Sequence, residues 1–303
     1  MLITQETLIH ALYFAPRGKV RLQQLGHHLS QRYLSPSDRL IGFIGDSGAG
    51  KSLLIKGMFP GLELTNDDEG INLRPLPLTA HYQGGRFMAH TYHVDVRFEL
   101  AFQQSWQLAE AVKAAVHQGR RVIVEHFDQL YPQLQVNPSV LIGVGEEVLV
   151  TRPGVFGPKP KEIADIVYKS IRYRKMAHTA EDLTAKVLVE MGYGRPQFHS
   201  DIRHGFVMEF EERPDFELDY VEQKVRDMIA ADLEIFCHDE EHIRIGKRSI
   251  FPCTGPRIHV NRTSEIEGFR LLKEFIWEPV REIYYMVGLV GDSRLEGVSD
   301  IAQ

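Results

Sequence analysis

The stretch "IGDSGAGKS", from Ile44 to Ser52, is the feature that most limits the folds open to this chain. It completes the apolar run "LIGFI" and is followed by "LLIKGMF", so we expect a buried strand before it and a helix after it. The pattern G-x-x-x-x-G-K-[ST] is met by Gly45, Gly50, Lys51 and Ser52. Glycines let the backbone turn tightly and aim N–H groups at an anion. The stretch therefore predicts a strand, a phosphate-binding loop and a helix, in that order.

Each residue type in this loop has a task in binding ATP or GTP together with Mg²⁺. A lysine at position 51 would reach the β- and γ-phosphates, and the Ser52 hydroxyl would ligate Mg²⁺. The positive end of the following helix adds to the attraction for phosphate. A Gly-rich turn without a ligand is the alternative, and the position between a strand and a helix favours the nucleotide. The predicted nucleotide-binding residues are Gly45, Asp46, Ser47, Gly48, Ala49, Gly50, Lys51 and Ser52.

An acid that holds Mg²⁺ or activates an acceptor is expected at the end of a neighbouring strand. Five acids stand at or just after expected strand ends: Asp67, Asp68, Asp95, Glu125 and Asp128. We expect catalytic roles for Lys51, Glu125 and Asp95, and a place for Asp128 beside the nucleotide. For each acid, a solvated carboxylate without a catalytic role remains the alternative.

Two short motifs in this region resemble those of known kinases. The segment "VIVEH" is similar to the strand-end glutamate of small-molecule kinases of the uridine kinase and phosphoribulokinase type. The loop "GDSGAGKS" resembles that of the same kinases and of HPr kinase. The resemblance is confined to these motifs, and it implies an NTPase or kinase.

Strands alternate with helices through residues 1–155, which predicts an α/β domain with a mostly parallel sheet. The run "HTYHVDVRF" is typical of a strand, "AFQQSWQLAEAVKAAVHQG" of a helix, and "SVLIGVGEEVLVTRP" of one or two more strands. The Pro- and Gly-rich stretch "TRPGVFGPKPKE", residues 151–162, is the candidate linker. The two predicted domains are therefore residues 1–155 and 156–303.

After the linker the pattern changes to that of an α+β domain. Helices are expected at "AEDLTAKVLVEMG" and "LDYVEQKVRDMIAADL", with short strands at "GFVMEFEE", "HIRIGKR" and "RIHVN". A final helix is expected over "EGFRLLKEFIWEPVREIYYMV", residues 267–287.

Composition limits the cellular compartment and the classes of partner that we expect. The two cysteines, Cys237 and Cys253, do not make a disulfide framework, so we expect a cytoplasmic protein. Neither a signal peptide nor a membrane span is expected. The net charge of −6 argues against a strongly basic nucleic-acid binder, so contact with tRNA would need a local cluster such as "KSIRYRK". The sequence does not specify an oligomeric state.

Two segments of the second half resemble the editing domain of alanyl-tRNA synthetases. The segment "RKMAHTAEDLTAKVL", Arg174 to Leu188, is similar to the first zinc half-motif, H-x-x-x-H within "HTATHLL". The segment "FPCTGPRIHVNRTSEIEGFRLLKE", Phe251 to Glu274, is similar to the second, "CGGTHV" followed by "T-x-E-I-G". The same domain occurs in threonyl-tRNA synthetases and in alanyl-tRNA trans-editing proteins. The resemblance covers roughly residues 165–275.

This resemblance implies a zinc site made of His178, Asp182, Cys253 and His259. The sequence departs from the family in two ways: Asp182 stands where the family has a histidine, and five residues separate Cys253 from His259 where the family has three. The set remains suitable for Zn²⁺, which accepts nitrogen, sulfur and oxygen ligands. His178 and Asp182, four residues apart, would share one face of a helix.

A competing set of ligands is "CHDEEH", with Cys237, His238 and His242, which we expect to be an exposed, charged turn. In the resembled family the activity is hydrolysis of the ester between a wrong amino acid and tRNA, for which a metal would activate water. The leading hypothesis is a nucleotide-dependent enzyme fused to an editing-like domain, acting on aminoacyl-tRNA or a related substrate. One alternative is a small-molecule kinase whose C-terminal domain only binds substrate or effector. Another is a nucleotide-switched RNA-binding or regulatory module.

Overall fold

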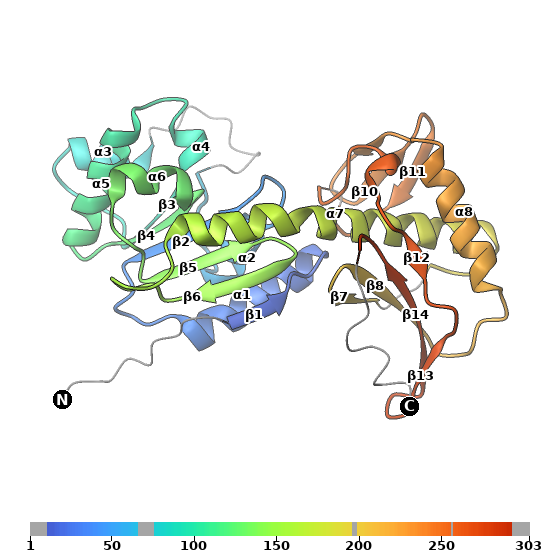
Figure 1. The fold of residues 1–303 in the computed structure, drawn as a ribbon. Helices are drawn as coiled ribbons and strands as arrows, with labels where there is room; N and C mark the ends of the chain where they lie inside the picture. Colours follow the sequence, from blue (N-terminus) through green and yellow to red (C-terminus); the bar gives the residue numbers. More distant parts are fainter. Residues whose placement is uncertain (1–10, 66–75, 196–198, 256, 293–303) are drawn as a thin grey trace. The chain divides into compact units, whose positions relative to one another are not determined.

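The computed structural model describes residues 11–65, 76–195, 199–255 and 257–292, so Asp67 and Asp68 lie outside the described residues. The chain forms two compact units. The first holds the residues up to 15 and residues 20–169, and the second holds residues 16–19 and those from 170 onward. The change of unit falls inside the long helix α7 (Pro160–Glu190), later than the boundary expected at 155 (Figure 1). Within the described ranges, no helix has the length and apolar character to cross a membrane.

The first unit contains a six-stranded mixed sheet with the strand order β1-β6-β5-β2-β4-β3. The strands are β1 (Ala11–Phe14), β2 (Leu40–Gly45), β3 (Thr91–Asp95), β4 (Arg121–Glu125), β5 (Val140–Val144) and β6 (Glu147–Thr151). The strands β5, β2, β4 and β3 are parallel, as predicted. The strand β6 pairs antiparallel with β5, because a tight hairpin joins them, and β1 pairs antiparallel with β6 at the edge of the sheet. The α/β class is confirmed, and the sheet is mixed.

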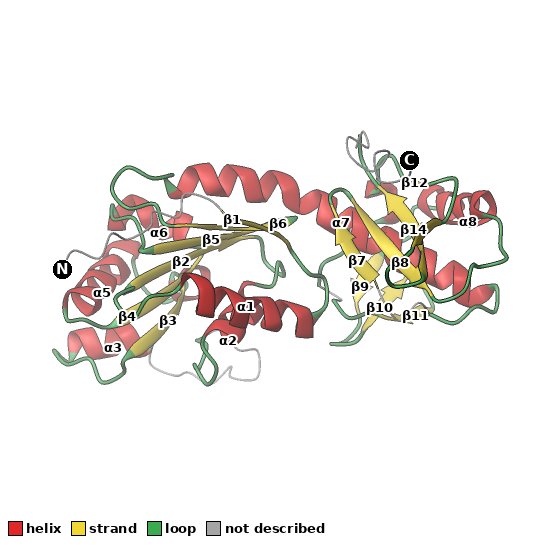
Figure 2. Cartoon of the chain, turned by 90° about the horizontal axis from the view of Figure 1, so that it is seen from below, coloured by secondary structure: helices red, strands yellow, loops and turns green. Residues whose placement is uncertain are grey.

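Helices cover both faces of this sheet (Figure 2). They are α1 (Lys19–Tyr33), α2 (Lys51–Met58), α3 (Pro77–Gln83), α4 (Val96–Glu99), α5 (Ser105–His117), α6 (Phe127–Leu134) and the first half of α7. Phe127 of α6 and Ile163 of α7 both lie against glycines on one face of strands β2 and β5. Helices α1 and α2 lie on the other face, so β2 is buried along its whole length.

The second unit packs helices on two antiparallel sheets. The larger sheet contains β7 (His199–Ile202), β8 (Gly205–Phe210), β12 (Arg270–Leu271), β13 (Ile276–Glu278) and β14 (Ile283–Leu289). The smaller sheet contains β9 (Ile235–Cys237), β10 (His242–Ile245) and β11 (Ser249–Pro252). The second half of α7 and helix α8 (Leu218–Ala230) enclose a core with these strands, which includes Leu183, Phe206 and Met286. The predicted helix near "LDYVEQKVRDMIAADL" is confirmed as α8.

The helix predicted over residues 267–287 is wrong, because this segment forms β12, β13 and the start of β14. Its aromatic and β-branched residues favour a strand, and Pro279 interrupts any helix. Trp277 pairs with Tyr284 across the β13–β14 ladder, with ring centroids 4.6 Å apart. The spacing of apolar residues that suggested a helix therefore belongs to the β13–β14 hairpin, in which successive side chains point to opposite faces.

The strand predicted at "RIHVN", residues 257–261, is also wrong, because this stretch is a loop. The backbone N–H of Val260 donates to the Thr179 hydroxyl of α7 at 3.1 Å instead of to a neighbouring strand. This bond ties the loop to the helix and brings His259 against it.

Candidate functional site

In the loop between β2 and α2, the lysine of the predicted motif is buried and bonded to the loop backbone. Lys51 is the first residue of α2 and is only 4% exposed, and its Nζ donates to the backbone carbonyl of Asp46 at 3.0 Å. Gly50 has a φ of 96°, and a Cβ there would lie 2.7 Å from the side chain of Leu22. Only glycine combines that left-handed backbone with so close a neighbour. The loop thus holds Lys51 next to the ends of the parallel strands.

Glu125 is contacted by three side chains from two elements, α2 and β3. It ends β4, which pairs directly with β2, and its Oε1 accepts from the Ser52 hydroxyl at 2.9 Å. Nε2 of His93 lies 3.1 Å from the same oxygen, and Nζ of Lys51 lies 3.7 Å from the other. Burial would raise the pKa of Glu125, but His93, Lys51 and Ser52 together lower it to about 2. Three predicted residues, Lys51, Ser52 and Glu125, therefore meet at one place. We call residues 45–52 with Asp95 and Glu125 the loop site.

Asp95 and Asp128 lie on either side of Glu125 along the chain. Asp95 ends β3, directly opposite Glu125 in the β3–β4 register, and caps α4 by accepting the Phe98 N–H at 3.2 Å. Asp128 lies in the first turn of α6, accepts from the Tyr168 hydroxyl at 3.3 Å, and has its pKa raised by burial. Asp95 is thus placed beside Glu125, whereas Asp128 is held by a tyrosine.

Sequence reasoning missed three titratable side chains around the loop site. His126 is 3% exposed and has a φ of 57°, which is uncommon for any residue but glycine. A potential ligand atom of His126 lies within 4.8 Å of those of Asp95 and Glu125. Burial, followed by the charges of Lys51 and Arg97, lowers its pKa to about 4, so it is a neutral imidazole at pH 7.

The other two are His93, which contacts Glu125, and Glu99 at the end of α4. Glu99 is fully buried, and this burial raises its pKa to about 7. Its Oε2 accepts from the Gln103 amide at 2.6 Å. No short motif marks these residues. Only the neighbouring apolar residues, Tyr92 and Val94 for His93 and Phe98 for Glu99, could have suggested their burial.

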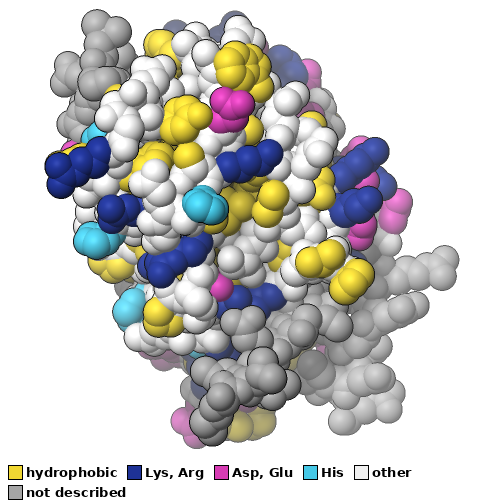
Figure 3. Space-filling view, turned by 90° about the vertical axis from the view of Figure 1, so that its left-hand side faces the viewer, with side chains coloured by type: hydrophobic (Ala, Val, Ile, Leu, Met, Phe, Trp, Pro, Cys, Tyr) yellow, Lys and Arg dark blue, Asp and Glu magenta, His cyan; other side chains and the backbone are white. Residues whose placement is uncertain are grey.

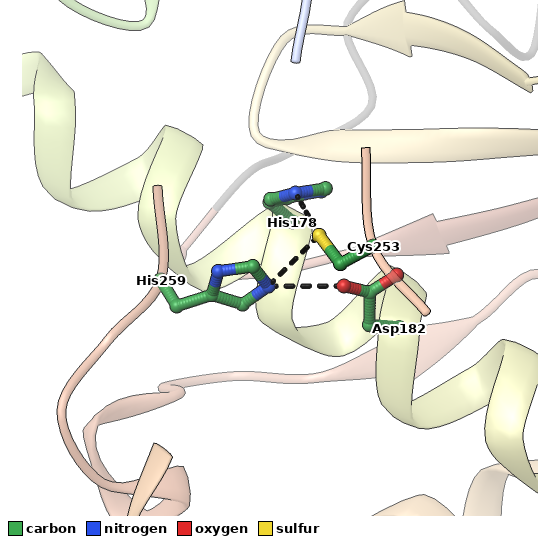
Figure 4. A group of neighbouring side chains, drawn as sticks. All are labelled: His178, Asp182, Cys253 and His259. Atoms are coloured by element: carbon green, nitrogen blue, oxygen red, sulfur yellow. Dashed lines mark hydrogen bonds and ion pairs between the residues drawn. The ribbon is translucent and has the colours of Figure 1, made fainter. Parts of the chain in front are cut away.

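The four ligands predicted in the second unit lie together (Figure 4). Helix α7 presents His178 and Asp182 one turn apart, Cys253 follows β11, and His259 comes from the loop described above. Sγ of Cys253 is 3.2 Å from Nε2 of His178 and 3.8 Å from Nε2 of His259. Nε2 of His259 is 3.0 Å from Oδ2 of Asp182. All four ligand atoms lie within 4.8 Å of one another, and we call them the four-ligand cluster.

The chemistry of this cluster fits a zinc ion. All four side chains are at most 4% exposed. Burial would raise the pKa of Asp182, but His178 and His259 lower it to about 2. Burial and the Asp182 carboxylate raise the pKa of the Cys253 thiol. A divalent cation would reverse that effect, since it stabilises the thiolate. A tetrahedral zinc site has ligand atoms about 3.4–3.8 Å apart, close to the separations here.

The competing "CHDEEH" segment is an exposed turn between β9 and β10, as expected. The Cys237 thiol donates to the Asp239 carbonyl, and Nδ1 of His242 is 2.9 Å from Oδ1 of Asp239. Among the residues that the structure places, these side chains form no metal-binding group.

The basic cluster predicted to contact tRNA is only partly exposed. In "KSIRYRK", Arg174 is buried and donates to the Pro16 carbonyl at 2.5 Å. Figure 3 shows the end of the first unit that carries α3 and α5, where Lys and Arg side chains are scattered among histidine, apolar and uncharged ones. Contact with tRNA stays a prediction.

Comparisons with known proteins identify no family for the chain. No family model matches it, and no curated protein matches it. Among solved structures, N-acetylornithine aminotransferase from Stenotrophomonas maltophilia aligns at 11% identity and a TM-score of 0.23, over 81% of this chain and 68% of that one. Cysteine desulfurase from Thermococcus onnurineus aligns at 12% identity and a TM-score of 0.25, over 97% of this chain and 77% of that one. Such low scores carry no argument about fold or function.

Proposed function

We propose that the first unit binds ATP or GTP with Mg²⁺ and that the protein is an NTPase or kinase-like enzyme. The observation that supports this most is the meeting of Lys51, Ser52 and Glu125 where parallel strands β2 and β4 end. Ligands of open α/β sheets bind at the carboxyl ends of their strands. A buried lysine at the start of a helix, beside a glycine turn, is suited to phosphate.

Each residue of the loop site would have its own role in phosphoryl transfer. Lys51 would leave the Asp46 carbonyl to bind the β- and γ-phosphates. The Ser52 hydroxyl and Glu125, already 2.9 Å apart, would hold the hydrated Mg²⁺. Asp95 would accept the proton of an attacking hydroxyl or water. Asp128, held by Tyr168, would stand beside the nucleotide rather than react.

Titration of a fluorescent ATP or GTP analogue into the full chain tests this proposal. In Lys51→Ala we expect the dissociation constant to rise by about 10- to 100-fold, because a charge-assisted contact to phosphate is lost. Lys113→Ala is the matched control, since Lys113 is an exposed lysine of α5. Equal affinity and turnover in Lys51→Ala and wild type would overturn the nucleotide role.

We further propose that the second unit binds zinc and acts on aminoacyl-tRNA or a related aminoacyl ester. The four-ligand cluster supports this candidate, since two imidazoles, a thiol and a carboxylate gather in a buried site. His178, Cys253 and His259 would hold the ion, and Asp182 would complete the set in the resting state. Zinc would polarise a carbonyl or a water molecule only where Asp182 leaves its position open to that molecule, because a closed four-ligand site is structural.

Product analysis separates the three functions. With ATP, Mg²⁺ and an aminoacyl-tRNA, the leading proposal predicts free amino acid, and the loss of Cys253 should abolish its release. A kinase whose second unit only binds substrate predicts phosphorylated acceptor and no deacylation. A regulatory module predicts nucleotide binding with neither product.

A further inference from the structure

The four-ligand cluster is surrounded by a second set of charged groups that no motif indicated. Oε2 of Glu181 lies 3.1 Å from Nδ1 of His178, one turn along α7. The other ring nitrogen of His178, Nε2, lies 3.2 Å from Sγ of Cys253. A carboxylate at Glu181 can only accept, and with that partner Nδ1 would carry the proton and Nε2 would present its lone pair to the cluster.

Arg17 in turn holds Glu181. Nε of Arg17 is 3.1 Å from Oε2 of Glu181, and its Nη2 is 2.9 Å from Oδ1 of Asp201 at β7. Its Nη1 also donates to the Gly205 carbonyl at 3.2 Å. Arg17 and Glu181 are each 5% exposed, so this is a buried charge network rather than a surface ion pair. Glu181 and Asp201 thus share one buried guanidinium.

The backbone around Arg17 also touches the turn that carries Cys253. The N–H of Lys19 donates to the Thr254 carbonyl at 3.4 Å. A Cβ on Gly255 would collide with the Arg17 carbonyl, and the N–H of Gly255 donates to Sγ of Cys253 at 3.2 Å. Glycine at 255 is thus required by this close approach. Residues 16–19, remote in sequence from every ligand, therefore belong to the surroundings of the cluster.

We propose that Glu181 and Arg17 are positioning residues of the metal centre. Glu181 fixes the tautomer and ring orientation of His178, and Arg17 fixes Glu181. This inference rests on the proposed zinc site. A metal-bound histidine usually donates its second nitrogen to a carboxylate, which orients the ring and raises its basicity. The network contacts His178 through Glu181, so its effect should pass through that ligand.

Titration of the full chain with Zn²⁺, and with Co²⁺ as a spectroscopic probe, tests the proposal. In Glu181→Gln we expect zinc affinity to fall by about 10- to 100-fold, because the amide is a weaker acceptor and has no charge. Arg17→Met should weaken binding in the same direction, and Arg17→Lys should restore part of it. The Co²⁺ ligand-field bands should shift in Glu181→Gln, which a purely structural role would not cause.

Glu222→Gln is the matched control. Glu222 is a buried carboxylate of α8 that accepts from the Leu271 N–H at 2.9 Å and is 7% exposed. If Glu181→Gln and Glu222→Gln weaken zinc equally, the network acts only through the fold and the positioning role is overturned. If Glu181→Gln and Arg17→Met, folded by circular dichroism, bind zinc like wild type, the role is overturned while the zinc site stands. If wild type itself binds no zinc, the proposed zinc function fails first, and this inference fails with it.

Discussion

The loop site and the four-ligand cluster are both buried, but they balance charge in different ways. In the loop site, the protein supplies its own cation: Lys51 lies 3.7 Å from Glu125, and Ser52 and His93 approach the other oxygen. In the cluster, the Arg195 guanidinium stands 3.7 Å from Asp182, and the four ligand atoms are all electron-pair donors. Lys51 is only 4% exposed whereas Arg195 is 30% exposed, so the cation of the second site is better screened by water and this site depends more on the protons of its ligands or on a metal. Loss of a metal should therefore affect the second unit far more than the first.

The largest effect is expected for Cys253→Ala, which removes the softest ligand. Wild type purified without chelator should contain about one zinc per chain, and the variant should contain almost none. Binding energy of a structural zinc is also folding energy, so we expect the second unit to lose several kcal/mol of stability. Zinc analysis and limited proteolysis with chelator measure this, and new cuts should fall beyond residue 170.

Cys237→Ala is the control for this prediction, since Cys237 is the exposed cysteine of the β9–β10 turn. It should keep full zinc and wild-type proteolysis. Full zinc in Cys253→Ala, or a wild type without zinc, would leave the cluster as a hydrogen-bonded group of packing residues. The editing chemistry would then be abandoned, and the kinase function would become the leading proposal.

The same comparison shows which parts of the molecule local sequence could predict. The loop was found because its residues form a short motif with fixed spacing. The four ligands were found through the resemblance of two short segments to the editing domain, although one residue and one spacing differ from it. Strands β2, β4 and β5 were found because burial on both faces makes them continuous apolar runs. The buried charge network of Arg17 and Glu181 was not found, because these two residues are far apart in sequence and only the tertiary fold brings them together.

The mistaken elements have a common physical cause. Residues 267–287 mix helix-forming and strand-forming residues, and only pairing with β8 decides in favour of β14. His259 lies in a loop because Thr179 supplies the hydrogen bond that a strand partner would have given. His126 was missed for the same reason, since no neighbouring residue in the sequence predicts a buried histidine with a left-handed backbone. In each case a long-range contact overrides local propensity.

A smaller effect, on stability and its pH dependence, is expected for Glu99→Gln near the loop site. Glu125 is compensated by its neighbours, whereas burial raises the pKa of Glu99 from 4.5 to about 7. Between those values the folded state binds a proton that the unfolded state has lost, so this carboxyl destabilises the fold as pH rises. Glu99→Gln should therefore gain about 1–3 kcal/mol at pH 8 and little at pH 4.

Urea unfolding of wild type and variant at both pH values measures this gain. Glu110→Gln is the control, because Glu110 is an exposed acid of α5 and should change stability by less than about 0.5 kcal/mol. A variant as stable as wild type at pH 8, or a gain equal at both pH values, would contradict an uncompensated Glu99.

The smallest effect is expected for Asp182→His, which tests how far the cluster depends on its carboxylate. Asp182 is the hard ligand of the set, and an imidazole nitrogen binds zinc at least as well. The substitution removes the 3.0 Å contact with His259 and the charge facing Arg195, but both contacts matter less once a cation is bound. We expect zinc affinity unchanged or up to about tenfold tighter. Competition with a chromophoric chelator measures it, with Asp182→Ala as the comparison that removes the ligand without replacing it. If Asp182→His loses zinc as completely as Cys253→Ala, this prediction is wrong. The cluster would then need an oxygen ligand at position 182, where the resembled family has a histidine.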